Sequence, residues 1–196
     1  MDVEERIARM EAPLLDNPED FEIPDRGLRA RDLQLERCAK PHAVKLCRQW
    51  HSRLPNTQRG PWQFAFKAHY MGVTYSVALW NNPSARTLPG HWLELRRLAN
   101  SPDSPYNTST RFLAWMVQYF EEHCPEREKC ISYQDTSVHE GTIYKAANWE
   151  VEHISTARER DRSGLRKGTN RKYRKDVNGK DPATSEKKRW AIELDP

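Results

Sequence analysis

The 196-residue sequence has no run of apolar residues near the roughly 20 that a membrane-spanning helix needs. Its N-terminus, MDVEERIARM, is charged where a secretory signal would be apolar. Only four cysteines are present, at positions 38, 47, 124 and 130, and their spacing matches no zinc-finger or CxxC pattern. We therefore expect a soluble, cytoplasmic protein without a membrane partner, whose thiols are reduced and mostly buried.

Hydrophobic residues are also scarce, at 37% of the chain, while charged residues reach 31%. This balance indicates that part of the chain lies outside a core. Aromatic residues are nevertheless frequent, with seven Trp, seven Tyr and five Phe, and a disordered polyelectrolyte avoids them. The length then fits one globular unit with peripheral extensions.

The charge is distributed unevenly along the chain. Residues 1–27 carry nine acidic and three basic side chains, whereas residues 157–190 carry thirteen basic and five acidic ones. We divide the chain into an acidic extension at 1–31, a central domain at 32–155 and a basic arm at 156–196. A polyanion is the expected partner of the arm, and a solvated tail is the alternative. The candidate nucleic-acid-binding residues of the arm are Arg166, Lys167, Arg171, Lys172, Arg174 and Lys175.

Hydrophobic periodicity predicts strands and a helix in the first half of the central domain. Alternation predicts a strand at 33–37, and an apolar stripe at helical spacing follows over 41–54. Residues 64–70 and 73–79 alternate on either side of the turn Met71-Gly72. This pattern predicts a β-hairpin.

In the second half, strands and helices alternate. A central strand is predicted at 91–99, and helix-capping residues at 107–110 precede an amphipathic helix that ends at His123. A strand at 130–135 and a short helix at 141–147 follow. After position 150 the periodicity fades, until a possible closing strand at 189–194. Together these elements predict a mixed α/β fold.

This order of elements resembles the GNAT acyltransferase fold over about 33–150, a central, mostly antiparallel twisted sheet flanked by helices. The most specific stretch is GTIYKAANWE at 141–150, where a Tyr-bearing helix runs into an Asn-Trp pair instead of the usual glycine-aromatic pair. One departure is SPYNTST at 104–110, which replaces the glycine-rich loop that grips the cofactor pyrophosphate at a helix N-terminus.

That departure, together with five short motifs, resembles the Mom family of bacteriophage DNA adenine-modification proteins. The motifs are Trp50-His51-Ser52, Leu95-Arg96-Arg97-Leu98, Asn107 with Ser109, Ser132-Tyr133-Gln134-Asp135 and Ile143-Tyr144-Lys145-Ala146. The resemblance implies an anti-restriction enzyme that transfers an acyl-derived, methylcarbamoyl- or acetamido-type group to adenine N6 in double-stranded DNA. It also implies an acyl donor, for which acetyl-CoA is the candidate although the usual pyrophosphate loop is absent.

Two residues have the chemistry of an acid and a base. Tyr144 occupies the place where GNAT enzymes often keep a general acid for the departing thiolate, and a packed amphipathic Tyr is the alternative. Asp135 ends a strand, where a carboxylate can accept a proton from an attacking amine. A turn-initiating Asp is the alternative for this position.

Further candidates come from the same resemblance. Arg96 lies in an apolar strand, where a buried arginine needs an anion such as Asp135 or a cofactor phosphate. Because Arg97 alternates to the opposite face, the motif favours Arg96 as the inward residue with a catalytic and donor-binding role. His51 closes the first helix, where GNAT enzymes admit the acceptor, although a lone helix-end His is usually structural. The other donor-binding candidates, each with ordinary capping as its alternative, are Asn107, Thr108, Ser109 and Thr110.

A DNA base must be flipped out and stacked, which requires aromatic side chains around a pocket and positive charge at its rim. Trp62, Tyr70, Trp80 and Trp92 are the aromatic candidates, and the hairpin core is their alternative.

The residues leave several questions open. His51, Asp135 and Tyr144 lack diagnostic metal-ligand spacing, so the metal requirement stays open. Two competing functions are a GNAT-fold N-acetyltransferase for a small-molecule or protein amine, and a noncatalytic DNA-binding protein on a GNAT scaffold.

Overall fold

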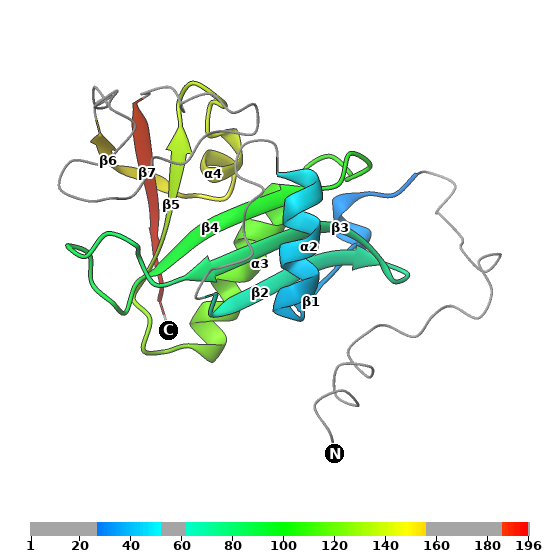
Figure 1. The fold of residues 1–196 in the computed structure, drawn as a ribbon, viewed down its shortest axis with the longest axis horizontal. Coiled ribbons are helices and arrows are strands. Elements are labelled where there is room, and N and C mark those ends of the chain that lie inside the picture. Colours follow the sequence, from blue (N-terminus) through cyan, green and yellow to red (C-terminus); the bar gives the residue numbers. More distant parts are fainter. Residues whose placement is uncertain (1–26, 52–61, 156–185, 196) are drawn as a thin grey trace, which may run out of the picture.

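A computed structural model of the chain describes residues 27–51, 62–155 and 186–195. Within these residues a seven-stranded sheet has the order β1-β2-β3-β4-β5-β7-β6 (Figure 1). The strands are β1 (Gln34–Arg37), β2 (Phe64–Tyr70), β3 (Val73–Asn81), β4 (Leu93–Asn100), β5 (Lys129–Asp135), β6 (Glu150–Ser155) and β7 (Lys187–Glu193). The helices are η2, a 3-10 helix (Ala30–Asp32), α2 (Lys40–Trp50), α3 (Thr108–His123) and α4 (Thr142–Ala146).

The sheet is mixed, as the sequence predicts. Strands β1 to β4 pair antiparallel in chain order, and β7 pairs antiparallel with both β5 and β6. The pairing of β4 with β5 is parallel, and the chain between them forms α3. The sheet of a mixed α/β domain is thus confirmed, with one crossover helix between its two halves.

The predicted hairpin and its Met71-Gly72 turn are confirmed. Tyr70 pairs with Val73, and the two turn residues Met71 and Gly72 have φ angles of 47° and 81°. Positive φ at both central residues is what a two-residue type I′ turn requires. Its twist matches the flanking strands, which fixes the register of β2 against β3.

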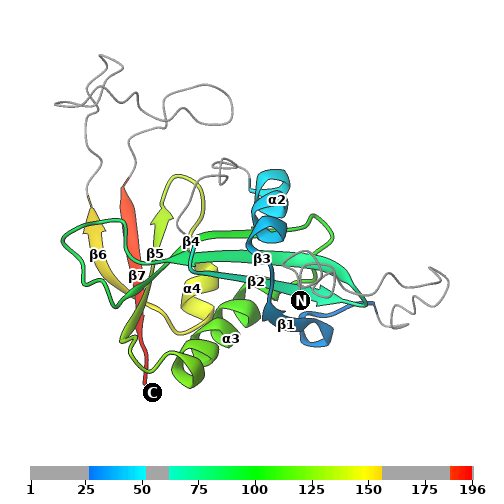
Figure 2. The same ribbon diagram turned by 60° about the horizontal axis from the view of Figure 1, so that its bottom comes forward.

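Helices cover both faces of the sheet (Figure 2). On one face, α2 packs through Ala43 and Cys47 onto β2, β3 and β4. On the other face, α3 buries one side, which confirms the predicted amphipathic helix, although His123 at its end is exposed. The buried residues of α3 are Thr108, Phe112, Leu113, Met116, Val117 and Phe120. The main hydrophobic core therefore lies between α3 and the sheet.

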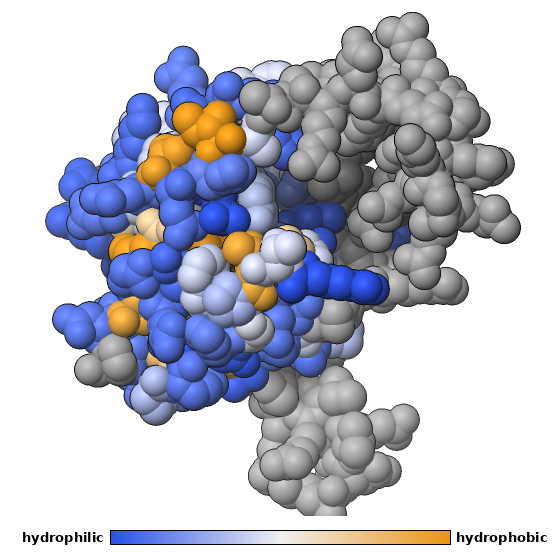
Figure 3. Space-filling model, turned by 90° about the vertical axis from the view of Figure 1, so that its left-hand side faces the viewer, coloured by the Kyte–Doolittle hydropathy of each residue, from blue (hydrophilic) through white to orange (hydrophobic). Residues whose placement is uncertain are grey.

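The structure adds one strand that the periodicity does not indicate. Strand β6 lies at the edge of the sheet, and five of its six residues are exposed. Val151 and Ile154 leave 40% and 51% of their surface exposed. Figure 3 shows one side of the molecule, on which apolar patches stand among polar side chains. Because β6 buries neither face, it has no alternating pattern. The expected closing strand is present as β7, between β5 and β6.

Some expectations concern residues that the structure does not describe. The acidic extension before residue 27, the end of the first helix beyond His51 and the basic arm between 156 and 185 lie outside the described ranges. Among the described helices, none is long and apolar enough to cross a membrane.

Candidate active site where β4 and β5 part

Strands β4 and β5 share only a short parallel ladder. Leu93 to Leu95 pair with Cys130 to Ser132, although β4 continues to Asn100 and β5 to Asp135. Beyond Leu95 and Ser132 the two strands therefore part, and the backbone groups along the facing edges are not joined in a ladder. In an α/β sheet, such an opening beyond the strand ends is where ligands commonly bind.

A β-bulge in β4 lies at the point of separation. Leu95 pairs with Trp80 and Arg97 pairs with Leu79, so Arg96 is the extra residue opposite adjacent positions of β3. A bulge bends its strand and redirects a side chain, and bulges are frequent beside active sites. Here the bulge accompanies the departure of β4 from β5.

The bulge also reverses the expected burial of the two arginines. Arg97 is 7% exposed, whereas the side chain of Arg96 is 25% exposed. The expectation that Arg96 is the buried residue is therefore wrong, because the extra residue interrupts the alternation on which it depends. The Nε atom of Arg96 lies 3.2 Å from Oε1 of Glu94, so its observed anionic partner is Glu94.

Tyr144 is buried at the same point of the sheet. Its hydroxyl lies 2.9 Å from Oγ of Ser132, the last residue of β5 that pairs with β4. The ring stacks on Trp190, with centroids 5.4 Å apart and an interplanar angle of 19°. Burial raises the pKa of Tyr144, while the hydrogen bond to Ser132 acts in the opposite direction. The phenol is therefore protonated at neutral pH and has a proton to donate.

A second contact fixes the helix that carries Tyr144. Nε1 of Trp190 donates a hydrogen bond of 2.7 Å to Oε1 of the buried Gln134. Gly141 precedes α4 with φ of 77°, and a Cβ atom there would lie 2.6 Å from Gln134 Oε1 and 2.7 Å from Trp190 Cζ2. Only glycine combines this backbone angle with such a close approach. The start of α4 is thereby held against β5 and β7.

Asp135 lies at the end of β5, as predicted. Its Oδ1 accepts hydrogen bonds from the backbone nitrogen of Ser137 at 3.1 Å and from the Ser137 hydroxyl at 2.6 Å. The turn-initiating role is therefore present in the structure. A carboxylate has about four lone-pair sites, so these two hydrogen bonds do not occupy all of them.

His139 is a residue of this region that the sequence reasoning missed. Its ring centroid lies 6.2 Å from that of Tyr144, and its Nδ1 accepts a hydrogen bond from the Gly141 nitrogen at 3.2 Å. Burial lowers the pKa of His139, and Asp135 partly opposes that shift. The imidazole is therefore neutral at pH 7. Its position four residues after Asp135 and five before Tyr144 is the one signal that could have found it.

The N-terminus of α3 carries the predicted donor-binding residues. Asn107 adopts a left-handed conformation with φ of 66°, and no side chain caps the helix by a hydrogen bond. The Thr108 hydroxyl donates to the Pro105 carbonyl at 2.7 Å, while Asn100 Nδ2 donates to Oγ of Ser109 at 2.7 Å. Ser109 thus ties α3 to the end of β4, and Thr110 is partly buried in the same turn. Uncapped backbone N–H groups at a helix start favour an anion.

His51 lies on the other face of the sheet from this cluster. Its backbone nitrogen ends α2 by donating to the Cys47 carbonyl at 2.9 Å. Burial and the charge of Arg97 lower the pKa of His51 to about 4, so the ring is neutral at pH 7. Tyr144, in contrast, belongs to the core on the α3 face. The structure therefore does not join His51 and Tyr144 in one hydrogen-bonded group.

No group of three or more His, Cys, Asp or Glu side chains suited to a metal ion occurs in the part of the chain that is described. Of the aromatic candidates for base stacking, Trp80 is fully buried in the core and donates from Nε1 to the sulfur of Met116 at 3.0 Å. The ring of Trp92 lies beneath Lys129 Nζ at 4.4 Å. Trp62 lines a surface groove beside α2.

Several solved structures of acetyltransferases share this arrangement. The ribosomal-protein-S18-alanine N-acetyltransferase from Escherichia coli matches with a TM-score of 0.56 and 11% identity, over 84% of this chain and 95% of that chain. An acetyltransferase of Bacillus subtilis in complex with CoA matches with a TM-score of 0.55 and 11% identity, over 83% and 99%. An IAA acetyltransferase from Bacillus cereus matches with a TM-score of 0.51 and 16% identity, over 83% and 99%.

These likenesses define the fold as that of a GNAT acyltransferase, which confirms the expected fold class. A search among curated proteins found no match. The sequence model of the Mom protein family matches residues 32–193. The chain therefore belongs to the Mom protein family, and the match includes β7 as well as the central domain.

Proposed function

We propose that this chain is an acyltransferase that modifies the exocyclic N6 amine of adenine in double-stranded DNA. The observation that carries the proposal is the buried, protonated Tyr144 beside Ser132, at the point where β4 and β5 part in a member of the Mom family. A phenol held there is suited to protonate a leaving group in the opening.

The uncapped start of α3 and the partly exposed Arg96 fit a phosphate-bearing donor. When bound, an acyl thioester of the acetyl-CoA class supplies an activated carbonyl. The helix N-terminus and the hydroxyls of Ser109 and Thr110 then replace the glycine-rich loop as the anion-binding group. Arg96 lies on the bulge beside the opening, where its guanidinium can move from Glu94 to a phosphate.

Asp135 and Tyr144 divide the proton transfers of the reaction. As the adenine N6 amine forms a bond to the acyl carbon, Asp135 accepts the proton that the nitrogen loses. As the carbon–sulfur bond breaks, Tyr144 gives its phenolic proton to the thiolate. The products are N6-acylated adenine and a free thiol, and both side chains return to their starting states by exchange with solvent. A methylcarbamoyl-type product requires further rearrangement of this adduct.

The basic arm supplies the proposed contact with the DNA backbone. Each phosphate that a cation neutralises on duplex DNA contributes about −0.9 to the slope of log affinity against log salt. Replacing the six arm residues by Gln is expected to flatten that slope. The residues are Arg166, Lys167, Arg171, Lys172, Arg174 and Lys175.

Mass spectrometry of nucleosides from host DNA tests the proposal. Wild-type chain is expected to produce a modified deoxyadenosine, and Tyr144→Phe or Asp135→Asn to reduce its rate of formation by about 10² to 10⁴. Both substitutions keep the shape of the side chain, and the amide oxygen that Asp135→Asn introduces would still accept the Ser137 hydrogen bonds. Tyr133→Phe is the matched control, because Tyr133 is 37% exposed and lies on β5, the strand that ends at Asp135.

Unmodified DNA from cells that contain folded wild-type chain overturns the proposal. If the chain then consumes acetyl-CoA with an amine acceptor but without DNA, it is an N-acetyltransferase. If it retains DNA and alters no nucleoside, it is a noncatalytic DNA-binding protein.

A further inference from the structure

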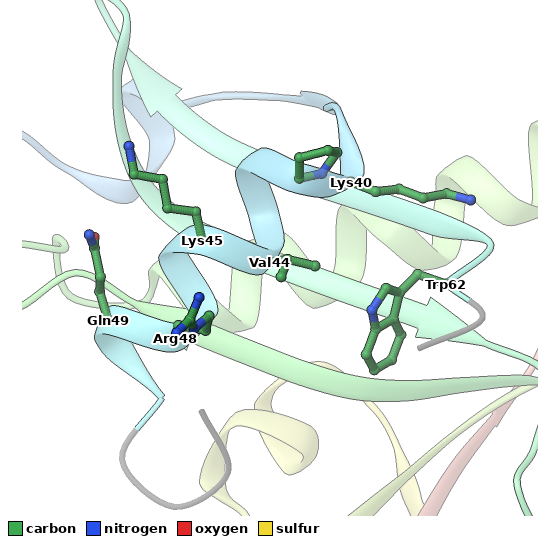
Figure 4. A pocket seen from close by; sticks show the side chains of 7 residues that line it. Lys40, Val44, Lys45, Arg48, Gln49 and Trp62 are labelled. Atoms are coloured by element: carbon green, nitrogen blue, oxygen red, sulfur yellow. The ribbon is translucent and has the colours of Figure 1, made fainter. Parts of the chain in front are cut away.

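A groove of about 730 Å³ follows the outer side of α2 and reaches Trp62, just before β2. Figure 4 shows Val44 facing the Trp62 indole, with Lys40 extending on the same side of the helix as Trp62. The groove is lined by Lys40, Pro41, Val44, Lys45, Arg48, Gln49 and Trp62. Three of these side chains are cationic and none is acidic.

The charge of this groove is not balanced within the described part of the protein. Lys40, Lys45 and Arg48 are exposed, and none of them forms an ion pair with another described residue. Helix α2 contains no Asp or Glu at all, whereas α3 carries Glu121 and Glu122 near its end. Neighbouring cations repel one another when no counter-charge is present, so the binding of a polyanionic ligand to them is favourable.

The spacing of the three cations suits a nucleic-acid backbone. Lys40 and Arg48 are eight positions apart, which corresponds to about 12 Å along a helix axis. One strand of duplex DNA presents a phosphate for about every 3.4 Å of duplex axis. Figure 4 shows Lys40 on the side of Trp62 and Lys45 on the other side of α2, so the three cations present charge across the breadth of the helix as well as along about 12 Å of it.

The helix that lines the groove packs on β4, the strand that carries the bulge. Helix α2 is followed by its C-cap His51, whose pKa is lowered by burial and then by the charge of Arg97 in β4. Arg97 directly follows the bulged Arg96, where β4 leaves β5.

We propose that Lys40, Lys45 and Arg48, beside Trp62, form a contact surface for the phosphate backbone of double-stranded DNA. The surface acts in addition to the basic arm. It rests on the proposed function because the duplex is taken to be the substrate that it holds.

Duplex binding by the full-length chain tests this surface. The variant Lys40→Gln, Lys45→Gln, Arg48→Gln is compared with wild type by fluorescence anisotropy on a short labelled duplex between 50 and 200 mM salt. Because the variant cannot neutralise three of the phosphates, the slope of log affinity against log salt is expected to flatten by about 2.7. Circular dichroism melting is expected to be unchanged, because the three residues are exposed and form no ion pair with a described residue.

A matched control removes the same charge elsewhere. Arg29, Arg31 and Arg86 are exposed. Arg29 directly precedes η2 and Arg31 lies within it, and η2 packs on α3, on the face of the sheet opposite α2. Their replacement by Gln is expected to change the slope by less than about 0.9, which is less than one phosphate contact.

The outcomes separate this surface from the proposed function. A slope equal to that of wild type, or equal to that of the control variant, overturns the surface even if wild type modifies adenine. An unchanged slope with a raised KM for the acyl donor also overturns it and assigns the groove to the donor. If wild type binds duplex DNA but alters no nucleoside, the proposed function fails, while a flattened slope still supports the surface. A wild-type chain that does not bind duplex DNA overturns the surface.

Discussion

The two faces of the sheet are built differently. The α3 face has a core of twenty buried residues, in which Phe66, Trp80 and Phe120 make edge-to-face contacts with centroids 5.0 to 5.6 Å apart. The buried cluster on the α2 face has six residues, all small or aliphatic. They are Ala43, Cys47, Ala65, Val77, Leu79 and Ala99. The α2 face also carries the buried Arg97 and the cationic groove.

The two faces therefore contribute differently to stability and to charge. Aromatic side chains bury the largest areas and gain further from edge-to-face geometry, so the α3 face contributes most of the hydrophobic stabilisation. The α2 face buries less apolar surface and can therefore hold charged side chains over the sheet.

Truncating one side chain on each face of the hairpin tests whether the α3 face contributes more stability than the α2 face. This test has the largest expected effect on the free energy of unfolding. Phe66→Ala on the α3 face is expected to lower the free energy of unfolding by about 3–5 kcal/mol. Val77→Ala, on the paired strand and the α2 face, is expected to lower it by about 2 kcal/mol, because fewer carbons are removed from a smaller cluster. Urea denaturation measures both, and equal losses would contradict the division.

A pair of glycines tests how tightly the α3 face holds α4. Gly141 and Gly72 have φ of 77° and 81°, so alanine at either is expected to cost about 1–2 kcal/mol from the backbone alone. Only at Gly141 does the added Cβ meet Gln134 and Trp190, which adds about 1–3 kcal/mol of overpacking. Calorimetric melting of both variants measures the difference. A loss at Gly72→Ala as large as at Gly141→Ala would argue against the tight contact.

The same contrast explains how much of the molecule its sequence predicts. The hairpin, α3, β5 and α4 follow from alternation, helical spacing and capping residues, because each element buries one face or one stripe. Strand β6 is not predicted, since it is exposed on both sides and its hydrophobicity has no period. The bulge at Arg96 is not predicted either, because it depends on the register of β4 against β3 and not on composition.

At the candidate site, the sequence predicts positions that depend on local structure but not contacts between distant parts of the chain. Asp135 and Tyr144 are predicted correctly as a strand end and a helix residue, since both positions are local. Trp190 meets Tyr144 because β7 pairs with β5, although the two residues are far apart in sequence, and Ser132 meets Tyr144 because α4 folds back onto β5. No local pattern reports such a contact, and His139 lies in an aperiodic turn.

Ser132 offers a test of intermediate size at the site. We expect Ser132→Ala to slow the reaction about tenfold, the equivalent of one hydrogen bond of about 1.4 kcal/mol. Since the Ser132 bond lowers the pKa of Tyr144, its loss raises that pKa further. The alkaline limb of the pH–rate profile should then move to higher pH.

Ser132→Thr keeps the hydroxyl and is expected to restore most of the rate and the original alkaline limb. Ser132 acts through Tyr144 and is a positioning residue. A slower rate with an unmoved alkaline limb in Ser132→Ala would assign it a purely structural role.

The smallest effect concerns acid stability on the α2 face. The pKa of His51 is lowered to about 4 by burial and by Arg97, against 6.5 for an ordinary histidine. At pH 5 the unfolded chain therefore binds a proton at His51 that the folded chain does not. This stabilising contribution is fully present above pH 6.5 and is lost as the pH falls toward 4. Because the ring is partly exposed, solvent screening limits the loss to about 1 kcal/mol.

Unfolding by urea at pH 7 and pH 5 measures this loss in wild type and in His51→Gln. The substitution removes the titrating group, so the decline in stability between the two pH values is expected to be smaller by about 1 kcal/mol. His153→Gln, on the exposed edge strand β6, is the control and should retain the full decline. A decline in His51→Gln equal to that of wild type would show that burial and the charge of Arg97 do not keep His51 neutral in the folded chain.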